Sequence, residues 1–307
     1  MTHSTESFVH PALFYRNSQE YLAGTVPFIQ KGLAVGEPVA VAVPGSNVQL
    51  LRAELGKSAE AVQFIDMKEA GRNPGRIIPK VLRAFADTPP SGRVRIIGEP
   101  IWPGRTPAEY PACVQHEALI NTAFRGREVT IVCPYDAARL DAAVLADAYA
   151  THPVVVDAGR EEYSDTYDPD RVVAAFNQPL ARPLRAAGFA FEAERLPDAR
   201  DFAVAQAKRL GLAGEREDDF ALAVAELTTN SVVHGGGSGT VWVWGEGGQV
   251  LCEVTDSGQL SDPLAGRRPP LRDQLGGRGL LMVNYLTDLV RVHTGPEGTA
   301  IRFHLGR

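Results

Sequence analysis

Residues 224–239 read VAELTTNSVVHGGGSG, and this stretch decides how the second half of the chain is interpreted. It closes an amphipathic run whose apolar residues recur at helical spacing, and glycines then break the pattern. Glu226 and Asn230 are four residues apart, so in a helix their side chains project from one face. Taken alone, such a pair is typical of a solvated helix face. The motifs that follow it along the chain change that interpretation.

The first of these motifs is VTDSGQL (254–260), at the end of an apolar run that predicts a strand. Asp256 stands where the strand ends, and a carboxylate there can accept a hydrogen bond from an exocyclic amine such as that of adenine. Gly258 would let a base approach the backbone closely. By itself the segment also fits an ordinary Asp-Ser-Gly turn.

Two further motifs complete the series. LGGRGLLMVNYLTDLV (275–290) is a glycine-rich loop that opens into a predicted helix. Backbone N–H groups at a helix start can hold phosphates, and Arg278 adds a charged fork. EGTAIRF (297–303) brings Gly298 and Thr299 into the last predicted strand. Each segment alone would pass for a loop or a hairpin.

In their order and spacing, these motifs resemble the ATP-binding domain shared by gyrase B, MutL and sensor histidine kinases, a Bergerat-type sandwich. The compact form and the sequence NSVVHGGG look most like RsbW-type anti-sigma factors and serine kinases. The resemblance implies that Glu226 is the catalytic base, that Asn230 holds Mg²⁺ and that Asp256 binds adenine. Leu260 departs from the pattern, in which a second glycine often follows. The further ATP or ADP contacts implied are Gly258, Gly276, Gly277, Arg278, Gly279 and Thr299.

The rest of the second half is consistent with an α+β layer. Apolar runs predict strands, and amphipathic runs predict helices gathered on one face of a mostly antiparallel sheet. The expected strands are 189–196, 239–244, 249–256, 289–294 and 299–305, and the expected helices are 197–212, 215–234 and 279–287.

The first half alternates short β-branched runs with helical segments, which predicts a doubly wound α/β domain with a parallel sheet. The expected strands are 39–44, 61–66, 93–99 and 129–135. The expected helices are 18–34, 46–56, 74–87, 107–124 and 141–150.

HPALFYRNSQEYLAGTVPFIQKGLAVGEPVAVAVP (10–44) together with GEPIWPGR (98–105) resembles the MEDS sensory domain, a relative of the RecA/KaiC-like fold. We therefore expect a MEDS-like domain at 8–160, a linker at 161–185 and an RsbW-type ATPase domain at 186–307. The first half lacks G-x-x-x-x-G-K-[ST], so P-loop chemistry is not expected there.

Open α/β sheets bind ligands beyond the carboxyl ends of their strands, so the first half is expected to bind a small or nucleotide-derived ligand. Core packing is the alternative for Trp102 and a capping role for His10. His116 is not expected to be a phosphoacceptor, because no long helical hairpin precedes the ATP-binding motifs. The candidate ligand contacts are His10, Tyr15, Glu99, Trp102, Arg105, His116, Glu117, Asn121 and Tyr135.

Composition sets the remaining limits. The 307 residues carry a net charge of −6 and no Lys/Arg block, which argues against direct nucleic-acid binding. No apolar run is long enough to span a membrane, and no secretory signal is evident at the start. The three scattered cysteines predict buried thiols in a reducing compartment, so a cytoplasmic location is expected.

These observations lead to one main expectation. It is a ligand-regulated anti-sigma factor that binds Mg-ATP or ADP and sequesters a sigma factor. Ser/Thr kinase activity on an anti-anti-sigma antagonist stays open, and a homodimer is implied by family resemblance alone. The alternatives are a signalling kinase or ATPase with another partner, and a ligand-sensing module with a vestigial nucleotide site.

Overall fold

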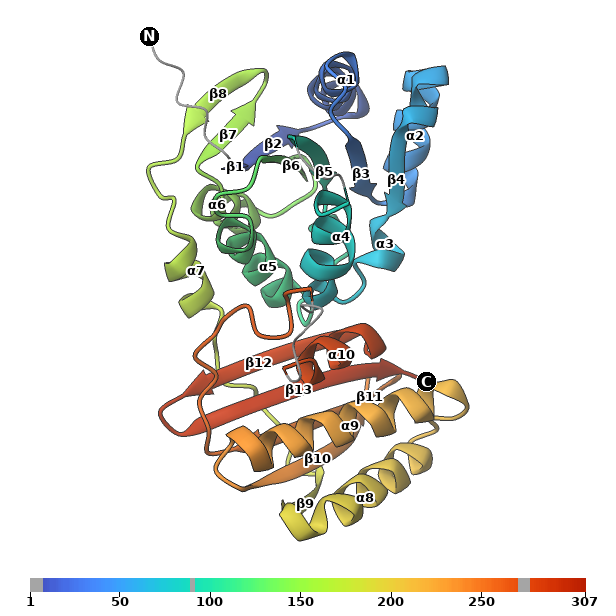
Figure 1. Ribbon diagram of the computed structural model, residues 1–307, viewed down its shortest axis with the longest axis vertical. Helices are drawn as coiled ribbons and strands as arrows, with labels where there is room; N and C mark the ends of the chain where they lie inside the picture. Colours follow the sequence, from blue (N-terminus) through green and yellow to red (C-terminus); the bar gives the residue numbers. More distant parts are fainter. Residues whose placement is uncertain (1–7, 89–91, 270–276) are drawn as a thin grey trace. The chain divides into compact units, whose positions relative to one another are not determined.

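The protein is described by a computed structural model that covers residues 8–88, 92–269 and 277–307. The chain divides into two compact units, Met1–Phe176 and Asn177–Arg307. Figure 1 shows that the first unit is built around a sheet with helices on it and that the second contains a separate sheet. The two units are described in turn.

The first unit is an α/β unit. Within the described residues its eight-stranded sheet has the order β4-β3-β5-β6-β2-β7-β8, with β1 paired to β6. All pairings are parallel except that of β7 with β8. The strands are β1 (Phe8–Val9), β2 (Pro11–Tyr15), β3 (Val39–Val43), β4 (Val62–Asp66), β5 (Val94–Gly98), β6 (Val129–Asp136), β7 (Val154–Asp157) and β8 (Arg160–Tyr163).

Helices cover this sheet, as the alternating pattern predicted. A core that includes Val41 and Leu51 joins α1 and α2 to the central strands. The helices are α1 (Ser18–Ala34), α2 (Gly45–Leu55), α3 (Met67–Ala70), α4 (Arg83–Ala86), α5 (Tyr110–Ala123), α6 (Ala142–Thr151) and α7 (Pro169–Ala175).

One predicted helix of the first unit has a different form. The segment 74–87 begins with a 3-10 turn, continues as a π-helical turn at Ile77–Leu82 and becomes α-helical only at Arg83. Pro79 lies inside the π-helical turn. Proline has no N–H to donate, and its ring clashes with the carbonyl of the residue four positions earlier. The missing donor and the ring clash are consistent with the departure from α-helical geometry here, although α1 keeps its α-helical form around Pro27.

The second unit is an α+β unit with one antiparallel sheet, in the order β12-β13-β11-β10-β9. Its core lies between this sheet and the helices, where the rings of Phe220 and Phe303 meet edge to face at 5.3 Å. Small side chains at Ala199, Ala203 and Ala207 let α8 approach α9 closely. The elements are β9 (Ala187–Glu192), α8 (Leu196–Arg209), α9 (Glu215–His234), β10 (Ser238–Glu246), β11 (Gln249–Asp256), α10 (Gly279–Leu286), β12 (Leu289–Gly295) and β13 (Gly298–Gly306).

The start of the second unit is attached to its sheet. Asn177 donates from Nδ2 to the carbonyl of Thr294 and accepts from its N–H. Arg182 stacks over the Trp242 ring at 3.8 Å and donates to Glu253 at 2.6 Å. Glu253 is buried and also binds Arg302, so two cations neutralise it. The range 161–185 thus contains the end of β8, helix α7 and this attached segment.

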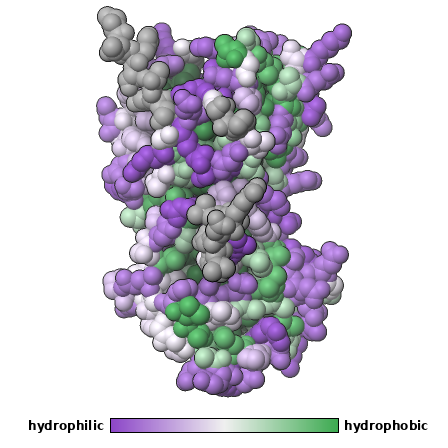
Figure 2. Space-filling model, in the orientation of Figure 1, coloured by the Kyte–Doolittle hydropathy of each residue, from purple (hydrophilic) through white to green (hydrophobic). Residues whose placement is uncertain are grey.

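Figure 2 shows hydrophobic residues in small groups between hydrophilic ones on the face that it draws. Among the described residues, no helix combines the length and apolarity required to cross a membrane. Isolated exposed apolar residues of this kind are usual on globular proteins.

We predict that Arg182→Ala destabilises the second unit by about 1–3 kcal/mol, because it leaves the buried Glu253 with one cation instead of two. The measurement is urea denaturation of the full chain, followed by Trp fluorescence. Arg185→Ala, which truncates an exposed arginine three residues later, is the matched control. Equal midpoints for the two variants would contradict the assigned role of Arg182.

Candidate functional site

Helix α9 and the start of α10 bring the first group of predicted nucleotide residues together. Glu226 and Asn230 project from α9 toward Gly279, the first residue of α10. A Cβ atom at Gly279 would lie 2.6 Å from Oε2 of Glu226 and 3.1 Å from Nδ2 of Asn230. A larger residue at this position would displace the ends of these two side chains. The predicted base, the predicted Mg²⁺ ligand and the glycine-rich motif share one location.

Asp256 forms the second group at the end of β11. Its Oδ2 accepts a hydrogen bond from Oγ of Ser231 at 2.6 Å, and its Oδ1 accepts from the N–H of Gly258 at 2.9 Å. A Cβ atom at Gly235 would lie 2.4 Å from the carboxylate carbon. The carboxylate is thus fixed against α9 on one side, and each oxygen keeps a lone pair for a further donor.

Thr299 belongs to the same group as Asp256. Its Oγ1 donates to the carbonyl of Gly258 at 2.8 Å and lies 2.9 Å from Oγ1 of Thr294. Gly298 has φ +127°, and a Cβ atom there would lie 2.0 Å from the Asp256 carbonyl oxygen. The Gly-Thr pair thus holds the turn that follows Asp256 against the end of the sheet.

The glycine-rich loop is described in part. Gly277 has φ +77° and is exposed, and Arg278 stands at the N-cap position of α10. Gly276 lies outside the described residues. A helix of eight residues follows, so its free N–H groups face the same end of α10 as Glu226 and Asn230.

A cavity of about 650 Å³ opens on another side of Asp256. Of the predicted nucleotide residues, it is lined by Asp256 alone. Its remaining walls come from the ends of β9, β10 and β11 and from Glu297. The cavity is therefore distinct from the surface between α9 and Gly279, and we do not assign the nucleotide to it.

In the first unit, Tyr15 and Glu99 meet at the carboxyl edge of the parallel sheet. Tyr15 donates to Oε1 of Glu99 at 3.1 Å, and Nδ2 of Asn47 donates to Oε2 at 2.8 Å. Burial raises the pKa of Glu99 to about 8, although the hydrogen bonds from Asn47 and Tyr15 oppose the shift and the charge of Asp136 adds to it. Glu99 is therefore largely protonated at neutral pH.

Arg105 and Trp102 form a separate contact. The guanidinium lies 3.8 Å from the centre of the Trp102 ring and donates to the backbone carbonyls of Gly71, Arg72 and Pro100. These bonds tie two loops together and use several donors of the arginine. They support a structural role for Arg105.

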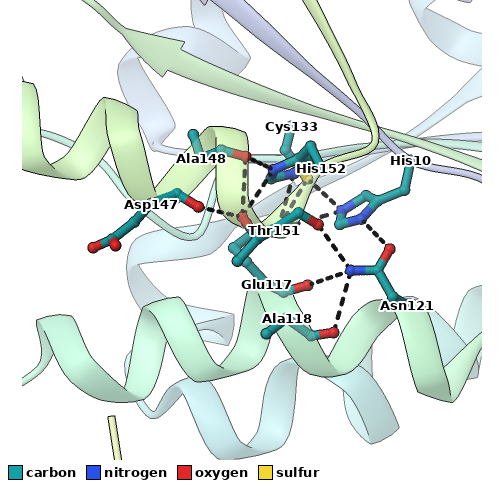
Figure 3. A network of polar contacts seen from close by, with 9 residues as sticks. All are labelled: His10, Glu117, Ala118, Asn121, Cys133, Asp147, Ala148, Thr151 and His152. Atoms are coloured by element: carbon teal, nitrogen blue, oxygen red, sulfur yellow. Dashed lines mark hydrogen bonds and ion pairs between the residues drawn. The ribbon is translucent and has the colours of Figure 1, made fainter. Parts of the chain in front are cut away.

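A second polar group lies beneath the sheet (Figure 3). We call it the buried donor cluster, and it consists of His10, Glu117, Cys133 and His152. All of these side chains are buried. Burial alone would raise the pKa of Glu117, but its contacts with His10 and His152 outweigh this effect and lower the pKa. Burial and the neighbouring His152 lower the pKa of His10.

The predicted ligand residues of the first unit therefore do not form one site. They divide into the Glu99 group, the Arg105 contact and the buried donor cluster. Asn121 binds His10, and the Tyr135 ring meets the His152 ring edge to face at 5.6 Å. His116 is buried on α5, which keeps its side chain from the solvent access that a phosphoacceptor requires.

Several residues of these groups were not predicted from the sequence. Ser231 and Gly235 follow Asn230 in the quoted stretch, but nothing in a single sequence indicates that Asp256 packs on them. Cys133 was correctly predicted as a buried thiol, while its histidine and carboxylate neighbours were not predicted. His152 follows helix α6 without a local motif, so only the fold places it beside His10.

The fold defines a class: an α/β unit with a mostly parallel sheet followed by an α+β unit with an antiparallel sheet. Comparison with known families agrees. Residues 9–153 match the model of the MEDS family, the methanogen/methylotroph DcmR sensory domain. Residues 189–305 match the model of the histidine kinase-like ATPase domain. The chain thus combines a MEDS domain with a histidine kinase-like ATPase domain.

Comparisons with individual proteins add little. No curated protein gave a significant match. A crystal structure of the RsbU and RsbW domains of a Mycobacterium tuberculosis protein is similar over 40% of this chain and 33% of its own length, with 20% identity and a TM-score of 0.31. The similar region thus spans about a third of that structure.

We predict that Glu99 contributes stability to the first unit that is lost as the pH rises from about 4.5 to about 8, so across this window the unfolding free energy of the wild type should fall relative to that of Glu99→Gln. Unfolded Glu99 releases its proton near the ordinary value of 4.5, while the folded group keeps it to about 8. Unfolding then releases a proton, so rising pH favours the unfolded state by about 1 kcal/mol per pH unit.

The measurement is the unfolding free energy of the full chain at several pH values. Glu54→Gln, which changes an exposed glutamate of α2, is the matched control and should keep the pH dependence. A difference in unfolding free energy between the wild type and Glu99→Gln that stays constant across this window would show that Glu99 ionises normally in the folded protein.

Proposed function

We propose that this protein is a ligand-regulated anti-sigma factor whose ATPase-like domain binds Mg-ATP or ADP. The observation that carries the nucleotide assignment is the contact of Gly279 with Glu226 and Asn230. The match of 189–305 to the histidine kinase-like ATPase family supports it. The sigma-factor partner rests on the resemblance of NSVVHGGG and the compact domain to RsbW-type proteins.

The residues between α9, β11 and α10 fit a bound Mg-ATP or ADP. Asp256 would accept a hydrogen bond from the adenine amine while Ser231 and Gly258 hold its carboxylate in place. Asn230 offers an amide oxygen, which suits Mg²⁺ with its remaining shell of waters and phosphates. The start of α10, with Gly277 and Arg278, would face the phosphates.

Glu226 would accept the proton released during a phosphoryl transfer. Its carboxylate lies on the same α9 face as Asn230, close to the start of α10. Bound ATP supplies a transferable phosphoryl group, and Glu226 would accept a proton from the attacking hydroxyl or water. On a Ser or Thr of an antagonist this is kinase activity, and on water it is hydrolysis.

The first unit would carry the sensory function. Its carboxyl edge presents Tyr15, Asn47 and Glu99, where open α/β sheets bind ligands. With Glu99 largely protonated, this edge can donate as well as accept hydrogen bonds. We therefore propose a small polar ligand, and a nucleotide-derived molecule remains within this class.

For the adenine contact, we predict that Asp256→Asn reduces the preference of the full chain for ATP over GTP about tenfold, because the amide replaces one acceptor by a donor. Calorimetric titration of both nucleotides is the measurement. Ser231→Ala removes the internal hydrogen bond but keeps the carboxylate, so it should retain most of the preference. Loss of the preference in Ser231→Ala alone would assign Asp256 a structural role.

For the metal contact, we predict that Mg²⁺ strengthens ATP binding to the wild type and no longer does so in Asn230→Ala. An effect of about tenfold corresponds to about 1.4 kcal/mol. Thr229→Ala changes an exposed neighbour on α9 and is the matched control. Equal Mg²⁺ dependence in all three proteins would remove Asn230 as the ligand.

The partner is tested by pull-down from native extract with tagged full chain, with ATP, with ADP and without nucleotide. Recovery of a sigma factor in one nucleotide state, lost in Asn230→Ala, supports the proposal. Recovery of another protein under the same conditions would favour a signalling kinase or ATPase. Absence of nucleotide binding altogether would favour the vestigial site.

A further inference from the structure

The buried donor cluster brings four metal-binding side chains together from four separate parts of the first unit. His10 lies between β1 and β2, Glu117 on α5, Cys133 on β6 and His152 between α6 and β7. One ligand atom from each lies within 4.8 Å of all the others. Figure 3 shows the side chains pointing toward one another.

Four of the six distances between these atoms resemble those in a tetrahedral metal site. Oε2 of Glu117 lies 3.3 Å from Nε2 of His10, 3.4 Å from Nε2 of His152 and 3.4 Å from Sγ of Cys133. Sγ of Cys133 also lies 3.4 Å from Nε2 of His10. With bonds of about 2.0–2.3 Å, a tetrahedral Zn²⁺ places its ligand atoms about 3.3–3.6 Å apart.

The surroundings of His10 determine which of its ring nitrogens presents a lone pair to the cluster. Nδ2 of Asn121 donates to the carbonyl of Thr151 at 2.8 Å, so Oδ1 of Asn121 points at His10. An amide oxygen accepts, and Nδ1 of His10, 3.1 Å away, must therefore carry a proton. In the neutral ring, Nε2 then presents its lone pair to Glu117 and Cys133.

His152 is held in the same way. Its Nδ1 lies 2.9 Å from the carbonyl oxygen of Ala148, which can only accept. Nδ1 therefore carries a proton, and in the neutral ring Nε2 faces Glu117 with a lone pair. Histidines that bind a metal commonly donate a hydrogen bond from their other ring nitrogen to a carbonyl or an amide oxygen in this manner.

With both imidazoles neutral, the cluster has more hydrogen-bond acceptors than donors. Nε2 of His152 and Oε1 of Glu117 make no hydrogen bond among the described residues, although both are buried. The His10 and His152 rings lie 4.1 Å apart, so two positive charges there would repel each other. A single metal ion would satisfy both nitrogens, the thiolate and the carboxylate together.

We propose that the buried donor cluster binds one Zn²⁺ ion. Two nitrogens, one sulfur and one oxygen in a tetrahedral arrangement are the donor set of zinc. Four protein ligands leave no open position, so the site stabilises structure and does not activate water. The ion would join the start of the chain, α5, β6 and the α6–β7 connection across one buried point.

The test uses tag-free full chain expressed with added zinc and without chelator. Elemental analysis should give about one zinc per chain in the wild type and in Cys252→Ser, which removes a buried thiol in the other unit. Cys133→Ser and His152→Gln should each lose most of it. Zinc retained in both of these variants would place the metal elsewhere and overturn the proposal.

Two further measurements cover variants that fold poorly. Asn121→Ala, which removes the hydrogen-bond partner of His10 but no proposed zinc ligand, should weaken zinc affinity about 10–100-fold. Wild type refolded with Co²⁺ should show the visible bands of tetrahedral cobalt and a thiolate charge-transfer band. A wild type without zinc or cobalt signal, whose Tm does not respond to zinc or chelator, contradicts the site.

Discussion

The carboxylate of Asp256 is the contact on which the arrangement of the second unit depends. It stands at the end of β11, yet it accepts a hydrogen bond from Ser231 of α9 and one from the backbone of Gly258. This places the last turns of α9 over one end of the sheet. Because Asn230 directly precedes Ser231, the same contact determines where the predicted Mg²⁺ ligand lies. The base-binding and metal-binding residues are thus positioned by one helix.

Glycines make this arrangement sterically accessible. Gly235, Gly279 and Gly298 each lie where a Cβ atom would overlap a neighbour, at Asp256, Glu226 and the Asp256 carbonyl respectively. They come from three separate motifs but serve one purpose, which is close approach of backbone to functional side chains. The ordered motifs in the sequence are therefore informative because each glycine contacts a functional side chain or backbone group from another motif. A glycine-rich loop without the other motifs would not predict such contacts.

The elements of the second unit could be predicted closely from the sequence because its helix period and strand alternation are strong. Helix α9 and strand β11 have the predicted bounds, Glu215–His234 and Gln249–Asp256. The elements of the first unit could be predicted less completely from the sequence. Strands β2 and β7 were not predicted. The buried donor cluster depends on the pairing of β2 with β7 and of β2 with β6. Contacts between residues 10 and 152 leave no local pattern, so only the fold brings them together.

Three buried glutamates show how differently this chain accommodates a carboxyl group. Glu253 lies between Arg182 and Arg302, whose charges replace water. Glu99 has only hydrogen-bond donors beside it, so burial raises its pKa and the proton removes the charge. Glu117 has neither solution, since its buried neighbours are two imidazoles and a thiol. These side chains are metal ligands themselves, so the group that they and Glu117 can share is one bound cation.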